Sequence, residues 1–150
     1  MTAFPKKCRY VVSACLAGTP CRYDGRSNLR PEIAALVENG EAVPVCPEVL
    51  GGLPTPRTPS ERQGDRVMSA EGDDVTGAFS AGAEAALYIA EECGCSAAVL
   101  KARSPSCGCG RIYDGTFTHT LVDGDGLFAA LLRKKGFQLF TEETFSAEKA

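Results

Sequence analysis

The sequence predicts one α/β domain over residues 1–150, a small three-layer, Rossmann-like fold with a mostly parallel sheet. Short apolar segments that suit strands alternate with helical patterns, which is typical of parallel sheets covered by helices. Hydrophobic residues make up 44% of the chain and charged residues 23%, so a folded core can form. The length of 150 residues suits a single domain of ordinary size.

The first half of the chain provides two strands and a helix. We expect a strand over Arg9–Ala14, which is rich in aromatic and β-branched residues, and a loop from Cys15 onward. Pro31–Asn39 predicts a helix, because proline suits the first turn and a glycine follows the last. Ala42–Cys46 predicts a second strand, although Pro44 within it cannot donate to a ladder.

The middle of the chain combines an irregular stretch with the strongest helical pattern. Residues 47–75 show little periodicity, so we expect a long loop or a lid, with a small strand at Val67–Met68. Asp74–Glu92 predicts a helix with an apolar stripe and with Thr76 as its cap. Ala97–Lys101 is apolar nearly throughout and predicts a strand buried on both faces.

The last third repeats the order of loop, helix and strand. We expect a loop over Ser104–Gly110, a helix over Asp123–Gly136, a closing strand over Phe137–Phe140 and a frayed polar tail over Thr141–Ala150. Two similar tetrapeptides with an Asp-Gly signal are expected to form turns, at residues 22–25 and 112–115.

Charge and hydropathy exclude several classes of function. Sixteen Lys and Arg residues against nineteen Asp and Glu residues give a net charge of -3, so we expect no strong nucleic-acid binding. No long apolar run predicts a membrane span, and the N-terminal residues lack the apolar stretch of a secretory signal. We therefore expect a cytoplasmic protein, and the sequence carries no signal for an oligomeric state.

Cysteine is the unusual residue type, with eight in the chain against a single histidine. About 5% cysteine lies below the level of a disulfide scaffold. In a reducing compartment, cysteines more often bind metal or perform chemistry. Because one histidine cannot build a multi-histidine site, any metal would be held by thiolates.

Three of the cysteines are expected to meet at one edge of the sheet. Cys15 follows the first predicted strand, Cys46 ends the second and Cys107 lies in the loop after the third. Open α/β sheets bind ligands outside the carboxyl ends of their strands, so these three thiols converge there. Of the rest, Cys8, Cys93 and Cys95 are expected to be buried apolar residues, whereas Cys21 and Cys109 lie near the candidate edge and stay open as ligands.

Three thiolates can hold two kinds of centre. An iron–sulfur cluster usually has four cysteine ligands, so three would leave one iron without a protein ligand. Zinc takes four ligands, or three and a water molecule, so a zinc-binding structural or interaction module with the same cysteines is the alternative. The sequence lacks the Cys-x-x-Cys of thiol redox enzymes and the signature of zinc nucleobase deaminases.

Side chains that can handle protons or charge lie beside these cysteines. Glu48, at the mouth of an apolar pocket, would hold a proton near neutral pH and donate it, unless it is exposed or ion-paired. Ser104 and Ser106 either cap a turn of their loop, or position a water molecule or act as a nucleophile. Lys101 and Arg103 follow the third predicted strand, and each either offers a positive charge to an anionic group or is solvated.

Five longer motifs follow one another along the chain. They are Ser13–Gly18 (SACLAG), Cys21–Gly25 (CRYDG), Pro44–Arg57 (PVCPEVLGGLPTPR), Ser104–Gly108 (SPSCG) and Ile112–Gly115 (IYDG). In sequence and order they resemble the bacterial thiouracil desulfurases, or desulfidases, a family long described as a domain of unknown function. The resemblance spans roughly residues 10–140, with no departure at the motif positions.

The resemblance implies the iron–sulfur interpretation. It implies a 4Fe-4S cluster held by Cys15, Cys46 and Cys107, and non-redox, hydrolytic removal of sulfur from a thiolated uracil, which binds the open iron. Glu48 and Ser104 match the positions that the family is thought to use for proton transfer and for attack on the carbon. The substrate expected for this short, acidic chain is a free base or nucleoside. We also expect substrate contacts from Ser13, Ser106 and Lys101.

Overall fold

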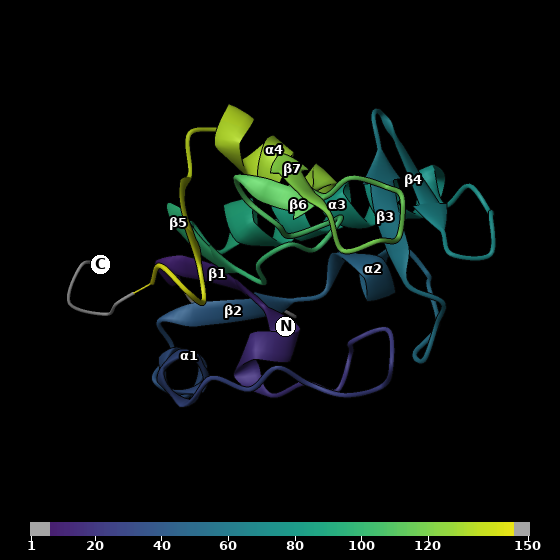
Figure 1. Ribbon diagram of the computed structural model, residues 1–150. Helices are drawn as coiled ribbons and strands as arrows, with labels where there is room; N and C mark the ends of the chain where they lie inside the picture. Colours follow the sequence, from purple (N-terminus) through teal and green to yellow (C-terminus); the bar gives the residue numbers. More distant parts are fainter. Residues whose placement is uncertain (1–6, 146–150) are drawn as a thin grey trace.

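A four-stranded parallel sheet forms the centre of the protein, whose computed structural model describes residues 7–145. The strands lie in the order β2-β1-β5-β8 (Figure 1). Each predicted strand lies within one residue of an observed one at both ends, so the prediction of a parallel sheet is confirmed. The observed bounds are β1 (Tyr10–Ser13), β2 (Ala42–Val45), β5 (Ala97–Leu100) and β8 (Gln138–Thr141).

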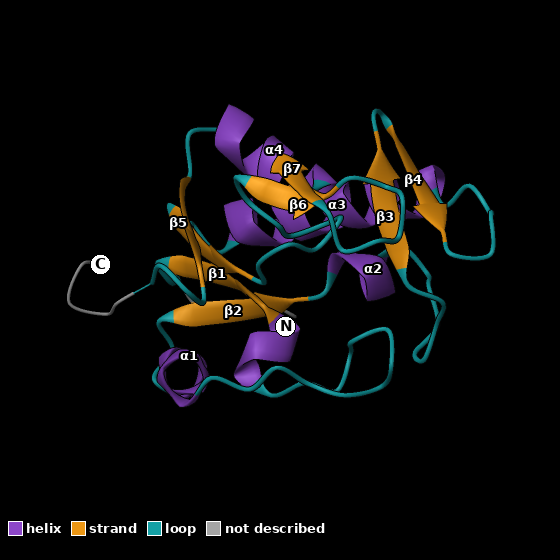
Figure 2. Cartoon of the chain, viewed as in Figure 1, coloured by secondary structure: helices purple, strands orange, loops and turns teal. Residues whose placement is uncertain are grey.

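Helices cover both faces of this sheet, which confirms the three-layer α/β class (Figure 2). Helix α1 (Pro31–Glu38) and the 3-10 turn Ala14–Ala17 pack on one face, and α3 (Thr76–Glu92) and α4 (Leu127–Lys134) pack on the other. The connections that cross the sheet in opposite directions use opposite faces, as right-handed crossovers require. None of the helices in residues 7–145 has the length and apolar character to cross a bilayer.

The core has two halves, one on each face of the sheet. Val11 and Ala98 point toward α3 and α4, where they pack with Phe128. Val12 and Val99 point to the other face, with the α1 residues. Because both faces are covered, β1 and β5 are buried throughout, which explains their unbroken apolar sequences.

Residues 47–75 contain structure that the sequence analysis did not predict. In place of a long loop they form α2 (Pro47–Leu50) and a hairpin of β3 (Ser60–Gln63) and β4 (Arg66–Ser69). The predicted strand at Val67–Met68 lies within β4 and is confirmed. Strand β3 reads Ser-Glu-Arg-Gln and its buried side chain is a glutamate, so it has no apolar signal.

A second hairpin shortens the predicted last helix. Strands β6 (Arg111–Tyr113) and β7 (Leu121–Asp123) pair antiparallel, and α4 begins at Leu127 rather than at Asp123. At Gly126 an added β-carbon would lie 2.5 Å from the Ser106 carbonyl oxygen, so the chain entering α4 is held against the loop after β5.

Two further expectations about helix and chain ends were wrong. Thr76 does not cap α3, because its Oγ1 accepts the Val67 N–H at 2.8 Å, and the Asp74 carboxylate accepts the Thr76 N–H instead. The tail is not frayed where it is described. Thr141 ends β8, and Glu142 is buried and accepts the Ala102 N–H at 2.8 Å. The rest of the predicted tail, 146–150, lies outside the described residues.

Candidate functional site

A cavity of about 610 Å³ opens at the carboxyl ends of β1, β2 and β5. The connection after β1 runs to β2, on one side, and the connection after β5 runs to β8, on the other side. The chain therefore turns in opposite directions after these two adjacent central strands. Such a switch point is where open α/β sheets bind ligands. Figure 1 shows the turn after β1, the start of α2 and the β6–β7 hairpin gathered beyond the strand ends.

The three cysteines expected to converge all line this cavity. Cys15 lies in the 3-10 turn after β1, Cys46 follows β2 directly, and Cys107 lies in the turn after β5. Cys15 and Cys107 are buried, and Cys46 is half-buried. Burial raises the pKa of the Cys107 thiol, and the charges of Cys15 and Cys46 act in the same direction. The fold thus brings three sulfurs from distant parts of the chain to one place.

A fourth thiol, Cys21, contacts two of the three. Its side chain is hydrogen-bonded to Cys15 and Cys46, which raises its own pKa and lowers theirs. The Cys46 pKa falls to about 7. The amide of Asn28 also donates to the Cys15 sulfur at 3.4 Å and lowers the Cys15 pKa further. These donors favour the thiolate forms, which are the forms that bind metal.

Ser13 connects the two central strands at the cavity. Its Oγ accepts the Lys101 N–H at 2.9 Å. Its hydroxyl is hydrogen-bonded to the Cys107 sulfur, which partly offsets the rise that burial causes in the Cys107 pKa. Ser13 is buried and lines the cavity. Ser13, at the end of β1, therefore orients the sulfur of Cys107, which follows the neighbouring strand β5.

Ser104 organises the loop that carries Cys107. Its Oγ accepts the N–H groups of Ser106 and Cys107 at 3.1 and 2.9 Å, which is the turn-capping role of a loop hydroxyl. A β-carbon at Gly108 would lie 2.7 Å from the Ser104 carbonyl oxygen, so only glycine fits this turn. Ser104 lines the cavity, and its own hydroxyl proton is left to donate.

Ser106 is not among the residues that line the cavity. Its side chain is fully buried, and its Oγ has no hydrogen-bond partner among the described residues. Its carbonyl oxygen accepts the N–H groups of Phe128 and Ala129 at 2.9 and 3.2 Å, at the start of α4. This residue anchors the cysteine loop to the helix.

Glu48 lies on the first turn of α2 and lines the cavity, paired with Arg57. The Arg57 Nε donates to its Oε1 at 2.9 Å, with the arginine side chain 7% exposed and the glutamate side chain 20%. Arg57 also donates to the carbonyl oxygens of Cys21 and Pro54 at 2.8 and 3.1 Å. A buried guanidinium thus fixes the position of the carboxylate at the cavity.

The positive charges expected near the cavity are paired with carboxylates. Lys101 and Arg103 both line it. The Lys101 Nζ lies 2.9 Å from a carboxylate oxygen of the buried Glu142, and Arg103 lies 3.1 Å from Glu143. The cavity therefore offers no unpaired cation from this strand end to an anionic group.

The other cysteines lie away from the cavity. Cys8 and Cys93 are buried in the apolar core, and the Cys8 and Cys95 sulfurs lie 3.8 Å apart at the opposite end of the sheet. Cys109 is half-buried against the same core. Within residues 7–145, no three His, Cys, Asp or Glu side chains are arranged around a single metal ion.

Several contacts at the cavity were not foreseen from the sequence. The contacts of Arg57 and Cys21 depend on loops that meet only in the folded chain, although both residues lie within recognisable motifs. Nothing in the sequence indicated that Glu142, in the stretch predicted as a polar tail, would contact Lys101. Aromatic side chains also line the cavity, and they are Tyr23, Tyr113, Phe117 and His119.

Comparisons with known proteins identify the family of this chain. The model of the 2-thiouracil desulfurase family matches residues 10–144. The uncharacterized protein YbbK of Bacillus subtilis (strain 168) is 42% identical over 142 residues, covering 88% of this chain and 94% of YbbK. The solved structure of the [4Fe-4S]-dependent thiouracil desulfidase TudS is 50% identical, covers 91% of this chain and 92% of TudS, and superposes with a TM-score of 0.86. The chain belongs to the 2-thiouracil desulfurase family.

Proposed function

We propose that this chain is a thiouracil desulfurase, which converts a thiolated uracil and water to uracil and sulfide without a redox change. The carbon–sulfur bond is broken, oxygen from water takes the place of the sulfur, and sulfide leaves. One observation carries the proposal: three thiols from three strand ends line one cavity, in a chain whose fold and half of whose sequence match TudS.

The side chains of the cavity fit a 4Fe-4S cluster held by Cys15, Cys46 and Cys107. Thiolates are the ligands that such clusters take. Hydrogen-bond donors already point at two of these sulfurs, from Asn28 and Ser13. With three protein ligands, a bound cluster supplies an open iron that acts as a Lewis acid on the substrate sulfur.

Two side chains are assigned roles toward the attacking water. Glu48, held in place by its ion pair with Arg57, accepts a proton from it. Ser104 donates a hydrogen bond from its hydroxyl to substrate or water and keeps its proton. Its oxygen lone pairs are occupied by the N–H groups of Ser106 and Cys107, so this hydroxyl suits positioning better than attack.

The cavity suits a small substrate. Its volume of about 610 Å³ is in the range of sites for small molecules. The net charge of -3 gives no broad attraction for a nucleic-acid backbone, so a free base or nucleoside is the proposed substrate. We place the enzyme in the cytoplasm, where a cluster with an open iron and the cysteines that do not bind it stay reduced.

Anaerobic cluster reconstitution tests this function. The loaded protein is expected to release uracil and sulfide from 2- or 4-thiouracil. Alanine at Cys15, Cys46 or Cys107 should remove bound iron, labile sulfide and turnover, whereas Cys95→Ala, at the far end of the sheet, should keep all three. Glu48→Gln should keep the cluster and lower kcat by about 10²–10⁴-fold, the usual contribution of a proton-transfer group.

Two results would contradict the proposal. A full cluster in all three cysteine variants would remove the ligand assignment. One zinc per chain, with neither iron nor labile sulfide after anaerobic purification, would support the zinc module in its place.

A further inference from the structure

Backbone strain in this protein is concentrated at the cavity. Among residues 7–145, three residues other than glycine have a positive φ: Arg103 (67°), Phe117 (59°) and His119 (59°). All three line the cavity. Each such residue costs roughly 1–2 kcal/mol and persists only where the surrounding structure holds it. Two of them lie in the loop of residues 114–120, between β6 and β7.

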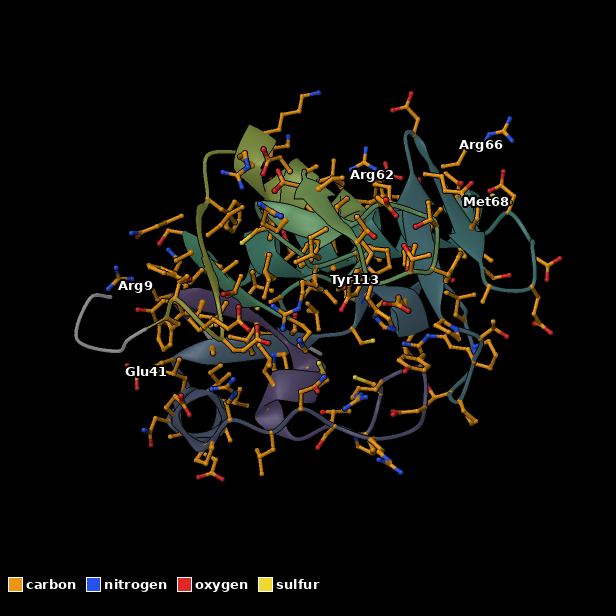
Figure 3. The ribbon with its side chains drawn as sticks, in the orientation of Figure 1. Arg9, Glu41, Arg62, Arg66, Met68 and Tyr113 are labelled. Carbon is orange, nitrogen blue, oxygen red and sulfur yellow. The ribbon has the colours of Figure 1, made fainter. Side chains whose placement is uncertain are left out.

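Glu61 of β3 holds this loop in its strained form. The Glu61 side chain is buried, and its Oε1 accepts the N–H groups of Gly115 and Phe117, both at 3.1 Å. The neighbouring Gln63 donates from Nε2 to the Gly115 carbonyl at 2.8 Å. Figure 3 labels Arg62 on β3 and Tyr113 on β6, the strands of the two hairpins that meet here.

Close packing also holds the loop against β3. Gly115 has φ 95°, and a β-carbon there would lie 2.4 Å from the Gln63 Cγ. The hydroxyls of Thr116, Thr118 and Thr120 form a chain of hydrogen bonds of 2.6 and 2.8 Å along the loop. The buried Glu61 side chain, close packing and the loop's own hydrogen bonds therefore hold the side of the loop that faces β3.

That other side is aromatic and faces the cavity. Phe117 is half-buried, and the rings of Tyr113 and His119 meet edge to face at 5.4 Å. Tyr23 lines the same cavity from a different loop. Aromatic faces bind flat heteroaromatic rings without a requirement for particular hydrogen bonds, and one stacked base is worth about 1–3 kcal/mol.

We propose that the loop of residues 114–120, locked by Glu61, is the surface on which the pyrimidine ring stacks. Phe117 is the stacking residue, and Glu61 is a positioning residue that acts through it. This inference rests on the proposed desulfuration, because it names the part of the cavity that selects a planar ring. Phe117 has its positive φ in the loop conformation in which it lines the cavity.

The test separates binding from chemistry in the reconstituted enzyme. Phe117→Ala should raise KM for thiouracil by about 5–150-fold, the cost of one lost stack, with kcat and iron content nearly unchanged. Phe117→Tyr should restore KM. Val122→Ala, on an exposed position of the same hairpin, is the matched control and should behave like the natural protein.

Glu61 is tested through its coupling to Phe117. Glu61→Ala should raise KM as Phe117→Ala does. The KM of the double variant should be no higher than that of either single variant, because both changes remove the same contact between Phe117 and the substrate ring. Glu61→Gln keeps an acceptor oxygen, so its KM should rise less than that of Glu61→Ala. This variant serves as the test if the alanine variant fails to fold. Circular dichroism reports folding.

The outcomes distinguish a failure of the proposed stacking surface from a failure of the proposed desulfurase function. If the natural protein turns over no thiouracil, the proposed function fails. If it turns over thiouracil but Phe117→Ala leaves KM unchanged, or the effects of Glu61→Ala and Phe117→Ala on KM multiply, the stacking surface is refuted while the desulfurase assignment stands.

Discussion

One thiol controls the reactivity of two others at the cavity. Cys21 is hydrogen-bonded to Cys15 and Cys46, and chiefly for this reason the Cys46 pKa lies at about 7. A lowered thiol pKa means that the thiolate is present at lower pH. In the cluster-free protein, alkylation of Cys46 should therefore rise through about pH 7, rather than near 8.5 as for an ordinary cysteine.

Two substitutions at one position check this cause. Cys21→Ala removes the hydrogen bond and should move the rise in Cys46 alkylation to higher pH, whereas Cys21→Ser keeps a donor and should move it less. Iodoacetamide labelling across the pH range, read by peptide mass, gives the profile. If both variants show the same Cys46 profile as the natural protein, Cys21 does not set the Cys46 pKa.

For single residues, the sequence predicts which side chains lie at the cavity better than it predicts their ion-pair partners. Glu48 was expected at the cavity, and it lies there, but its pairing with Arg57 depends on a loop that returns nine residues later. Lys101 was likewise expected near the cavity, yet its charge is paired with Glu142 from the far end of the chain. Residue type and strand position fix where a side chain lies, whereas its partners depend on tertiary contacts.

Among the elements, α2 carries Glu48 and depends on a glycine contact with α3. A β-carbon at Gly82 would lie 1.7 Å from the Pro47 carbonyl oxygen, and one at Gly51 would lie 2.0 Å from that of Ala78. Backbone therefore packs on backbone, with no side chain that could yield. This contact fixes the distance of α2, and of the Cys46 that precedes it, from the core.

Gly82→Ala should consequently displace α2. We expect a loss of stability of about 1–3 kcal/mol or more from overpacking, together with reduced cluster occupancy. Gly77→Ala is the matched control in the same helix, because a β-carbon added there would have no neighbour within 4 Å, and it should be neutral or slightly stabilising. Urea unfolding and iron content measure both effects. Equal behaviour of the two variants would contradict the role of this contact.

The contrast between strands that were predicted and strands that were not has a physical cause. Strands β1, β2, β5 and β8 form around the core, so their apolar composition identifies them. Strand β3 has no apolar side chain, and it is held by hydrogen bonds that the side chains of Glu61 and Gln63 form with another hairpin. Polar tertiary contacts of this kind leave no periodic pattern in the sequence.

For the whole molecule, parallel topology explains why the cysteine positions could be interpreted at all. Spacings of 31 and 61 residues fit no local metal motif, yet the carboxyl ends of parallel strands meet at one edge. The cavity at that edge contains all three thiols. Cys21, whose role the sequence left open, lies with them because the loop after β1 folds back along the strand ends.

This arrangement makes cluster binding a cross-link between three separate strand ends, so the loaded protein should be more stable than the cluster-free one. A ligand present at about 100 times its Kd stabilises the folded state by about 2.7 kcal/mol, and for a domain of this length that raises Tm by roughly 5–10 °C. Anaerobic thermal unfolding before and after chelation measures the difference. Cys107→Ala removes one attachment point and should give the same Tm in both conditions. If the natural protein also unfolds at one temperature with and without iron, the three loops are not joined by the metal centre, and the thiols at this cavity have another role.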